Sequence, residues 1–258
     1  MLKPRSYSRR RSGRKYRFLK SYFHLGWDVL SRIPALSRWP VRQVFIKQMY
    51  FSGTESIGAV GWQAVLIGLV VITQINNLVG NNEVLSIKIM IWTLVRELGP
   101  LLSAVVIISR SSSAFASELS TMQVDGEIKN LRRMGISPIS YLVMPRVFAM
   151  TLASITLTFY FQTIAISTGL VVAGLRMDFS LLSEIYNFFE IIDFREMLVS
   201  IIKSATFGIL IALVSCFHGM RKKSAMTEVP QAVSQAVLRS LFAVLLAGGI
   251  ITVVGFRS

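Results

Sequence analysis

The sequence predicts an all-α polytopic membrane protein with an N-terminal interfacial helix, five transmembrane helices and a cytoplasmic helix between the second and third spans. Three observations lead to this fold class. Of the 258 residues, 53% are hydrophobic and only 16% are charged, and the mean hydropathy is +0.57, which gives more apolar surface than a soluble core of this size needs. Several apolar stretches reach bilayer length. Basic residues gather in alternate connectors.

Residues 1–52 form a basic arm that precedes the membrane domain predicted for residues 53–258. The arm holds 13 of the 28 Lys and Arg residues, and Asp28 is its only acid. An arm of this kind is attracted to the anionic cytoplasmic leaflet and is retained on that side, so we expect no nucleic-acid partner. Its Arg- and Ser-rich start also resembles an organellar transit peptide, which leaves an organellar inner membrane open as an alternative location.

Within the arm, aromatic residues between Tyr16 and Trp27 predict an interfacial helix. Pro34 and Pro40 then predict a break in the chain. A second short amphipathic piece, VRQVFIKQMYF, follows the break and precedes the first span.

Five windows are long and apolar enough to cross a bilayer, which takes about 17 to 25 residues. They are residues 57–79, 87–108, 147–173, 197–217 and 233–256. The first window is weakened by Gly58, Gly61 and Gly68. Its far end is polar at residues such as Gln74 and Asn77, so we expect it either to enter only part-way or to line a cavity.

The charges of the connectors set the orientation. With the basic arm in the cytoplasm, the connectors that carry Lys129, Arg132 and Arg133, and later residues 221–223, fall on the same side. Five spans then place the C-terminus outside. The outer connector, about residues 174–196, is acidic and amphipathic, and we expect an interfacial helix that is either a lid over the bundle or a docking surface.

The second span carries Arg96 and Glu97 inside an apolar helix. A charged group at bilayer depth costs several kcal/mol, so such residues usually face a bundle interior or a wet cavity. Gly99 and Pro100 predict a kink directly after them, because proline removes a helix hydrogen bond.

Further along the same span, small residues recur every four positions at Ser109, Ser113 and Ser117. This spacing places them on one side of a helix and allows a neighbouring helix to approach closely. The sequence therefore predicts a helix-packing face here.

The segment 118–135 is amphipathic. One face carries Val124, Ile128 and Leu131, and another carries Asp125, Lys129, Arg132 and Arg133. Gly135 and Pro138 predict its end. The pattern leaves two interpretations open: a surface helix on lipid head groups, or a lever that docks into a separate motor subunit.

Catalytic and metal-ligand motifs are missing from the sequence. It has no GxxxxGK[ST], HExxH or CxxC pattern, His24 and His218 are far apart, and Cys216 is the single cysteine. We therefore expect no enzyme activity and no metal or cofactor in this chain. A secondary transporter would need ion-coupling acids and usually an internal repeat, and neither is seen. A membrane scaffold without transport stays open as an alternative.

One ordered set of residues resembles the signature of the MlaE (YrbE) permeases, the membrane subunits of MCE-type lipid ABC transporters. The set is Arg96-Glu97-Leu98-Gly99-Pro100, Arg110, Ser113-Ala114, Ala116, Glu118, Thr121-Met122, Ile128, Leu131, Met134-Gly135, Pro138, Pro145-Arg146, Asp193-Phe194-Arg195, Ile202-Lys203-Ser204, Phe217-His218-Gly219 and Ala232 to Leu238. The resemblance covers the chain from about Val41 to its end.

The resemblance implies a homodimer in the bacterial inner membrane, in which each copy has an interfacial helix and five transmembrane helices. A separate ABC ATPase, which binds ATP and Mg, would sit below the dimer, and an MCE lipid-binding protein would sit on the outer, periplasmic side. The amphipathic segment becomes the coupling helix. A phospholipid or a related lipid would then pass between the membrane and the MCE protein.

The same resemblance assigns site residues. Arg96, Glu97 and Lys203 match polar residues associated with the family's lipid cavity, and Gln74 and Asn77 are further candidates at the polar end of the first span. Asn77 stands where many relatives have an aromatic residue, which implies a more polar pocket. The ATPase-coupling candidates are Glu118, Asp125, Glu127, Lys129, Arg132 and Arg133.

Two departures from the family pattern stand out. Ser109 replaces a common glycine, and Asp125-Gly126-Glu127 replaces a common Thr-Glu-Gln in the coupling helix. A glycine inside a helix costs up to about 1 kcal/mol relative to alanine. The acid has also moved by one position, or about 100° around the helix.

Overall fold

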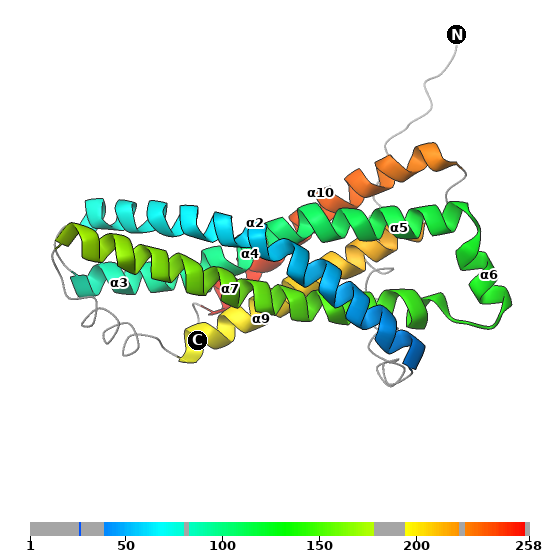
Figure 1. Cartoon of the computed structure of the whole chain (residues 1–258), viewed down its shortest axis with the longest axis horizontal. Helices are drawn as coiled ribbons and strands as arrows, with labels where there is room; N and C mark the ends of the chain where they lie inside the picture. The colour runs from blue at the N-terminus through cyan, green and yellow to red at the C-terminus, as the bar shows by residue number, and fades with distance from the viewer. Residues whose placement is uncertain (1–25, 27–38, 80–82, 178–193, 222–224, 256–258) are drawn as a thin grey trace, which may run out of the picture.

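The computed structural model describes residues 26, 39–79, 83–177, 194–221 and 225–255, and these ranges are helical apart from short turns and contain no strand (Figure 1). The interfacial helix predicted at residues 16–27, apart from Gly26, and the centre of the predicted outer connector lie outside the described residues. Within them, the all-α fold class is confirmed.

The predicted number of five spans is also confirmed in the described part of the chain. The helical stretches long and apolar enough to cross a membrane are Val41–Val79, Lys88–Val124, Ile139–Gly174, Phe194–Gly219 and Met226–Gly255. Most extend well beyond the predicted apolar windows because the helix continues through polar residues at its ends. The longest element, α2 (Trp39–Val79), has 41 residues. At 1.5 Å per residue it is about 60 Å long, twice the thickness of a bilayer core.

The course of α2 corrects the predicted break at Pro40. Pro40 is the second residue of α2. In the first turn of a helix the backbone N–H has no acceptor within the helix, so proline is tolerated there. The piece VRQVFIKQMYF therefore runs into the first span within one helix, and the predicted domain division at residues 52 and 53 falls inside it. Gly68 does not interrupt α2. It lies directly against the backbone of Ala165 in α7 (Met144–Met177), where the absence of a side chain permits close packing.

The second span is a series of five helical segments. They are α3 (Glu83–Ile91), η2 (Trp92–Leu98), α4 (Gly99–Ile107), η3 (Ile108–Ser112) and α5 (Ser113–Val124). Both η2 and η3 are π-helical. The irregularity predicted at Gly99 and Pro100 takes the form of η2, in which Gly99 N–H donates to the carbonyl of Leu94, five residues back instead of four. A further π-helical segment, η4 (Ile139–Val143), leads into α7.

Gly126 divides the segment that the sequence predicts as one helix from 118 to 135. Residues 118–124 belong to α5, and a separate α6 (Glu127–Arg133) follows. Gly126 has φ of 77°, in the left-handed region that favours glycine. The predicted helix-interior cost therefore does not arise, because Gly126 is the residue at which the chain turns. Gly135, with φ of 76°, makes the turn after α6.

The remaining helices complete the bundle around α7. α7 packs against α2 and α9 (Phe194–Gly219), and α10 (Val229–Gly255), which follows the short η5 (Met226–Glu228), packs against α9 and α5. In Figure 1, α6 and the starts of α2 and α10 lie at one end of the bundle, and the end of α2 and the start of α3 lie at the other. We call the first of these the α6 end.

Candidate functional site

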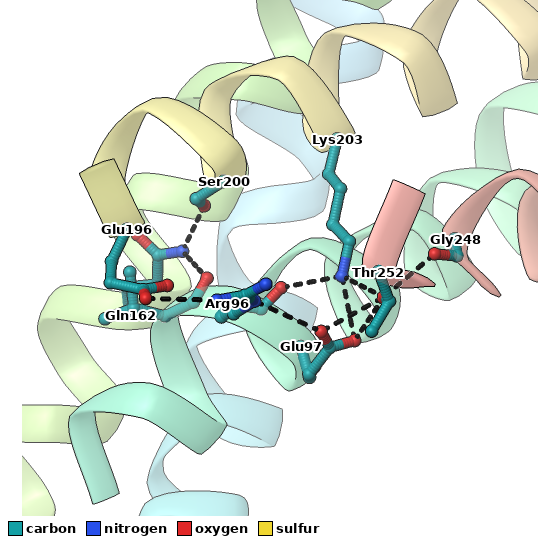
Figure 2. A network of polar contacts seen from close by, with 9 residues as sticks. Arg96, Glu97, Gln162, Glu196, Ser200, Lys203, Gly248 and Thr252 are labelled. Carbon is teal, nitrogen blue, oxygen red and sulfur yellow. Dashed lines mark hydrogen bonds and ion pairs between the residues drawn. The ribbon is translucent and has the colours of Figure 1, made fainter. Parts of the chain in front are cut away.

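A network of charged and polar side chains joins the second span to α9 and α10 (Figure 2). Lys203 on α9 is its centre and is 2% exposed. Its Nζ donates to Glu97 Oε2 at 2.8 Å, to the Arg96 carbonyl at 3.0 Å and to Thr252 Oγ1 at 2.8 Å. The structure thus brings together all three residues that the family resemblance assigns to the lipid site. We call this group, with the residues described next, the central network.

Arg96 extends the central network to the start of α9. Its Nη1 donates to Glu196 Oε1 at 3.1 Å, and its Nε lies 3.9 Å from Glu97 Oε1. The guanidinium also lies over the ring of Trp92, 5.9 Å from its centroid. The two cations and two carboxylates therefore balance in formal charge, which lowers the cost of holding them inside an apolar bundle.

The carboxylates of the central network are its most accessible part. The Glu97 side chain is 35% exposed, whereas those of Arg96 and Lys203 are 8% and 2% exposed. Thr252 on α10 lies 3.1 Å from both Glu97 oxygens and 2.9 Å from the carbonyl of Gly248. Glu97 is thus the charged group that can exchange its partners with the least loss of buried contacts.

Four polar residues of the central network were not predicted as site residues, namely Gln162, Glu196, Ser200 and Thr252. Glu196, Ser200 and Lys203 lie on one face of α9, because Ser200 follows Glu196 by four residues and Lys203 follows Ser200 by three. Gln162 lies in the uncharged third span, and its Nε2 donates to the Val95 carbonyl at 3.0 Å and to Ser200 Oγ at 2.7 Å. The helical spacing from Lys203 could have identified Glu196 and Ser200. No sequence pattern pointed to Gln162.

The other two lipid-cavity candidates lie apart from this group. Gln74 and Asn77 are exposed residues of the last turns of α2, and they are not among the residues of the network in Figure 2. Their part in a lipid site stays a prediction.

A second charged cluster lies nearer the α6 end. Arg146 on α7 is 1% exposed, and its Nη2 is 2.7 Å from Glu118 Oε2 on α5. Its Nη1 donates to the Leu142 carbonyl at 3.1 Å, and its guanidinium lies 5.7 Å from the Phe115 ring centroid. We call these residues the Arg146 cluster. It clamps together the helices that come before and after α6, and it already engages Glu118, a predicted ATPase contact.

The other ATPase-coupling candidates lie on or beside α6 with their side chains exposed. They are Asp125, Glu127, Lys129, Arg132 and Arg133. Ile128 is buried on the opposite face, 2% exposed, and holds α6 against the bundle. The structure therefore leaves a charged surface free at the α6 end, and contact with an ATPase stays a prediction.

The predicted packing serines, Ser109, Ser113 and Ser117, lie on a different face of the second span from the serines that contact other helices of this chain. Ser109 is exposed, and the hydroxyls of Ser109 and Ser113 donate to carbonyls within their own span. Contacts inside the chain instead use the neighbouring face, where Ser112 Oγ is 2.7 Å from Ser215 Oγ. The face that carries Ser109, Ser113 and Ser117 is therefore not the buried one within a single chain, and its packing against a further helix stays a prediction.

A helical bundle with five candidate spans is the architecture of a multi-pass membrane protein, and charged groups inside such a bundle usually mark a substrate or ion pathway. In the described residues no group of His, Cys, Asp and Glu could hold a metal ion. Residues 45–254 match the family model of the permease MlaE. The chain therefore belongs to the MlaE permease family and is a membrane permease subunit, and the family implies an ATPase partner.

Individual relatives agree with this assignment. The chain is 26% identical over 218 residues, 83% of each sequence, to a probable ABC transporter permease protein of Rickettsia prowazekii (strain Madrid E). It is 30% identical over 211 residues, 80% of this chain and 79% of the relative, to another of Synechocystis sp. (strain ATCC 27184 / PCC 6803 / Kazusa). It is also 32% identical over 152 residues, 59% of this chain and 43% of the relative, to the chloroplastic protein trigalactosyldiacylglycerol 1 of Arabidopsis thaliana.

Proposed function

We propose that this chain is the transmembrane subunit of an ABC transporter that moves a phospholipid or a related lipid between the bacterial inner membrane and an MCE lipid-binding protein. Two copies form the transport unit, and a separate ATPase that binds ATP and Mg drives it. The N-terminus and the α6 end lie in the cytoplasm, and the C-terminus lies on the outer side, where the MCE protein docks.

The observation that carries the proposal is the central network. Ionic groups inside a membrane bundle usually mark a substrate or ion pathway. Lys203 and Arg96 suit the phosphate of a lipid head group, because both donate charge-assisted hydrogen bonds. Glu97 compensates their charge when no lipid is present, and its partial exposure allows a head group to displace it.

The name of one relative also supports a lipid cargo. The Arabidopsis protein carries in its name a galactolipid, trigalactosyldiacylglycerol. The long apolar helices of this chain also give acyl chains an apolar surface at the depth of the central network. A lipid is therefore the substrate class that best fits both the charged residues and their surroundings.

ATPase coupling is assigned to α6. Its exposed charges stand at one end of the bundle, and the Arg146 cluster ties the helices on either side of it. Neutralising two of these charges in one variant, Glu127→Gln with Arg132→Gln, is expected to weaken co-purification with the ATPase. Unchanged binding would remove the basis for α6 as the coupling helix.

Transport is tested with the purified complex in nanodiscs. Bound lipid is identified by mass spectrometry together with the partner subunits, and lipid transfer to the MCE protein is then followed with ATP. Arg96→Ala, Glu97→Ala and Lys203→Ala should assemble and lose transfer, whereas Lys88→Ala, at an exposed lysine of α3, should keep it. Normal transfer by the three variants would contradict the assigned site, and a complex without ATPase or lipid would favour a scaffold.

A further inference from the structure

Gly99 and Pro100 deprive two backbone carbonyls of their usual donors. In an α-helical register the Val95 carbonyl would accept from Gly99 N–H, but Gly99 N–H donates to the Leu94 carbonyl. In a π-helical register the Val95 carbonyl would accept from the N–H of residue 100, but residue 100 is proline and has no N–H. The Arg96 carbonyl loses its α-helical donor at Pro100 for the same reason. A carbonyl without a donor inside a bilayer is unfavourable, so these two need partners from elsewhere.

Side chains from two other helices supply those partners. Gln162 Nε2 on α7 donates to the Val95 carbonyl at 3.0 Å, and Lys203 Nζ on α9 donates to the Arg96 carbonyl at 3.0 Å. The orientation of the Gln162 amide follows from its surroundings, because a backbone carbonyl only accepts hydrogen bonds and the NH₂ group must face it. Neighbouring helices commonly satisfy the backbone near a proline in this way.

A second hydrogen bond links Gln162 to α9. The same NH₂ group donates to Ser200 Oγ at 2.7 Å, and Ser200 is 1% exposed. Ser200 lies on α9 between Glu196, the partner of Arg96, and Lys203, the partner of Glu97. One amide thus connects the backbone just before Arg96 to the stretch of α9 that holds Glu196, the ionic partner of Arg96, and Lys203, the ionic partner of Glu97.

We infer that Gln162 is a positioning residue of the lipid site. It takes the place of the missing Pro100 N–H, holds η2 in its π-helical register and so presents Arg96 and Glu97 to Lys203. That the site binds lipid rests on the proposed function. That Gln162 positions η2 rests on the hydrogen bonds alone. Gln162 itself contacts the backbone of η2 and Ser200, and it acts on the lipid through Arg96 and Glu97.

The test is a rescue experiment on the full complex in nanodiscs. Gln162→Leu removes both hydrogen bonds at similar volume and is expected to raise the lipid concentration for half-maximal transfer by about threefold to tenfold. Pro100→Ala restores a backbone N–H next to the orphaned carbonyls, so Gln162→Leu combined with Pro100→Ala should recover most of the lost affinity. A residue that only fills space would not be rescued by a new N–H four to five positions from those carbonyls.

Two further variants keep the test decisive. Thr158→Val is the matched control, because Thr158 lies one turn earlier on α7, is 1% exposed, and its hydroxyl has no hydrogen-bond partner in the described structure. It should leave transfer unchanged. Gln162→Asn keeps the amide but shortens it, and it replaces Gln162→Leu if the leucine variant does not assemble. It should show the same rescue by Pro100→Ala at smaller amplitude.

Hydrogen exchange of the peptide that contains residues 92–98 separates this inference from the proposed function. Exchange should accelerate in Gln162→Leu, return in the double variant and stay normal in Thr158→Val, whether or not lipid moves. This pattern without lipid transfer by the wild-type complex would refute the proposed function and leave Gln162 as the residue that positions η2. Equal effects of Gln162→Leu and Thr158→Val, or no rescue by Pro100→Ala, would overturn the inference itself.

Discussion

The central network and the Arg146 cluster differ in how many partners each charge has. In the central network Glu97 has Lys203, Thr252 and, more distantly, Arg96 within reach, and its side chain is partly exposed. In the Arg146 cluster the buried guanidinium has a single carboxylate, Glu118, and its Nε has no hydrogen-bond partner in the described structure. Shared partners allow a group to move and still be paired, whereas a single partner fixes it.

The number of partners distinguishes an adaptable region of this bundle from a rigid one. A charge that loses its only partner in a buried position is strongly destabilising, while a charge with alternatives loses less. We therefore expect substitutions in the Arg146 cluster to reduce stability, and substitutions in the central network to reduce transport before stability. We expect the loss of stability to fall from Glu118→Ala through Lys203→Met and Gly126→Ala to Thr252→Val.

Glu118→Ala is expected to cause the largest loss of stability. It leaves the buried Arg146 guanidinium with the Leu142 carbonyl and the Phe115 ring as neighbours, and the expected cost is about 3 kcal/mol. Thermal unfolding of the complex in nanodiscs measures it. Lys88→Ala, at an exposed lysine of α3, is the control and should unfold with the wild type. If the two variants unfold alike, the Glu118 pair does not stabilise the bundle.

Lys203→Met should cost less stability, about 1–2 kcal/mol, and abolish lipid transfer. The methionine keeps the length of the side chain. It removes the donor to the Arg96 carbonyl, but Glu97 retains Thr252 and its partial exposure as compensation. Unfolding and transfer are measured on the same sample. A stability loss as large as that of Glu118→Ala would contradict the contrast between shared and single partners.

Gly126→Ala should cost about 1 kcal/mol, because the substitution places a Cβ on a residue with φ of 77°. No atom lies within 4 Å of that Cβ position, so the strain is conformational and not steric crowding by neighbours. Gly126→Asn should be better tolerated, since asparagine adopts left-handed conformations more readily. Co-purification with the ATPase measures whether α6 is displaced, and equal behaviour of both variants would argue against a required left-handed residue.

Thr252→Val should have the smallest effect, about 0.6 kcal/mol, which is the average for polar contacts between membrane helices. Lys203 and Glu97 stay within 2.8 Å of each other without the hydroxyl. We expect normal assembly and a modest change in lipid transfer. A loss of transfer as complete as in Lys203→Met would show that α10 takes part in binding the head group.

How far the sequence predicts this structure depends on whether a feature follows from composition or from local geometry. Hydropathy predicts five spans, and the cost of charge in a bilayer correctly marks Arg96 and Glu97 as residues that need partners. The continuity of α2 was missed because Pro40 falls in the first turn, where proline is tolerated. The role of Gly126 was missed because the helical pattern on either side of it continues through the turn.

The partners of the charged residues were harder to predict. Lys203 was assigned by family resemblance. Gln162 lies 67 residues from Val95, whose carbonyl it contacts, and Ser200 contacts Gln162; neither carries a charge that hydropathy would flag. The π-helical register of η2 is also invisible in periodicity, because a single wide turn shifts the apolar pattern by only one residue. Only the packing of α7 and α9 against η2 reveals these contacts.

The surroundings of Gly99 limit the size of the residue that can stand at position 99 while Gln162 is in place. A Cβ on residue 99 would lie 2.9 Å from both Cγ and Nε2 of Gln162 and 2.7 Å from the Leu94 carbonyl, so residues 99 and 162 occupy one shared volume. A larger residue at 99 would need both a smaller residue at 162 and a shift of the Leu94 carbonyl, so these two positions should change together. Pro100 removes a donor and Gly99 makes room for its substitute, so we expect Gly99, Pro100 and Gln162 to vary together in relatives of this chain.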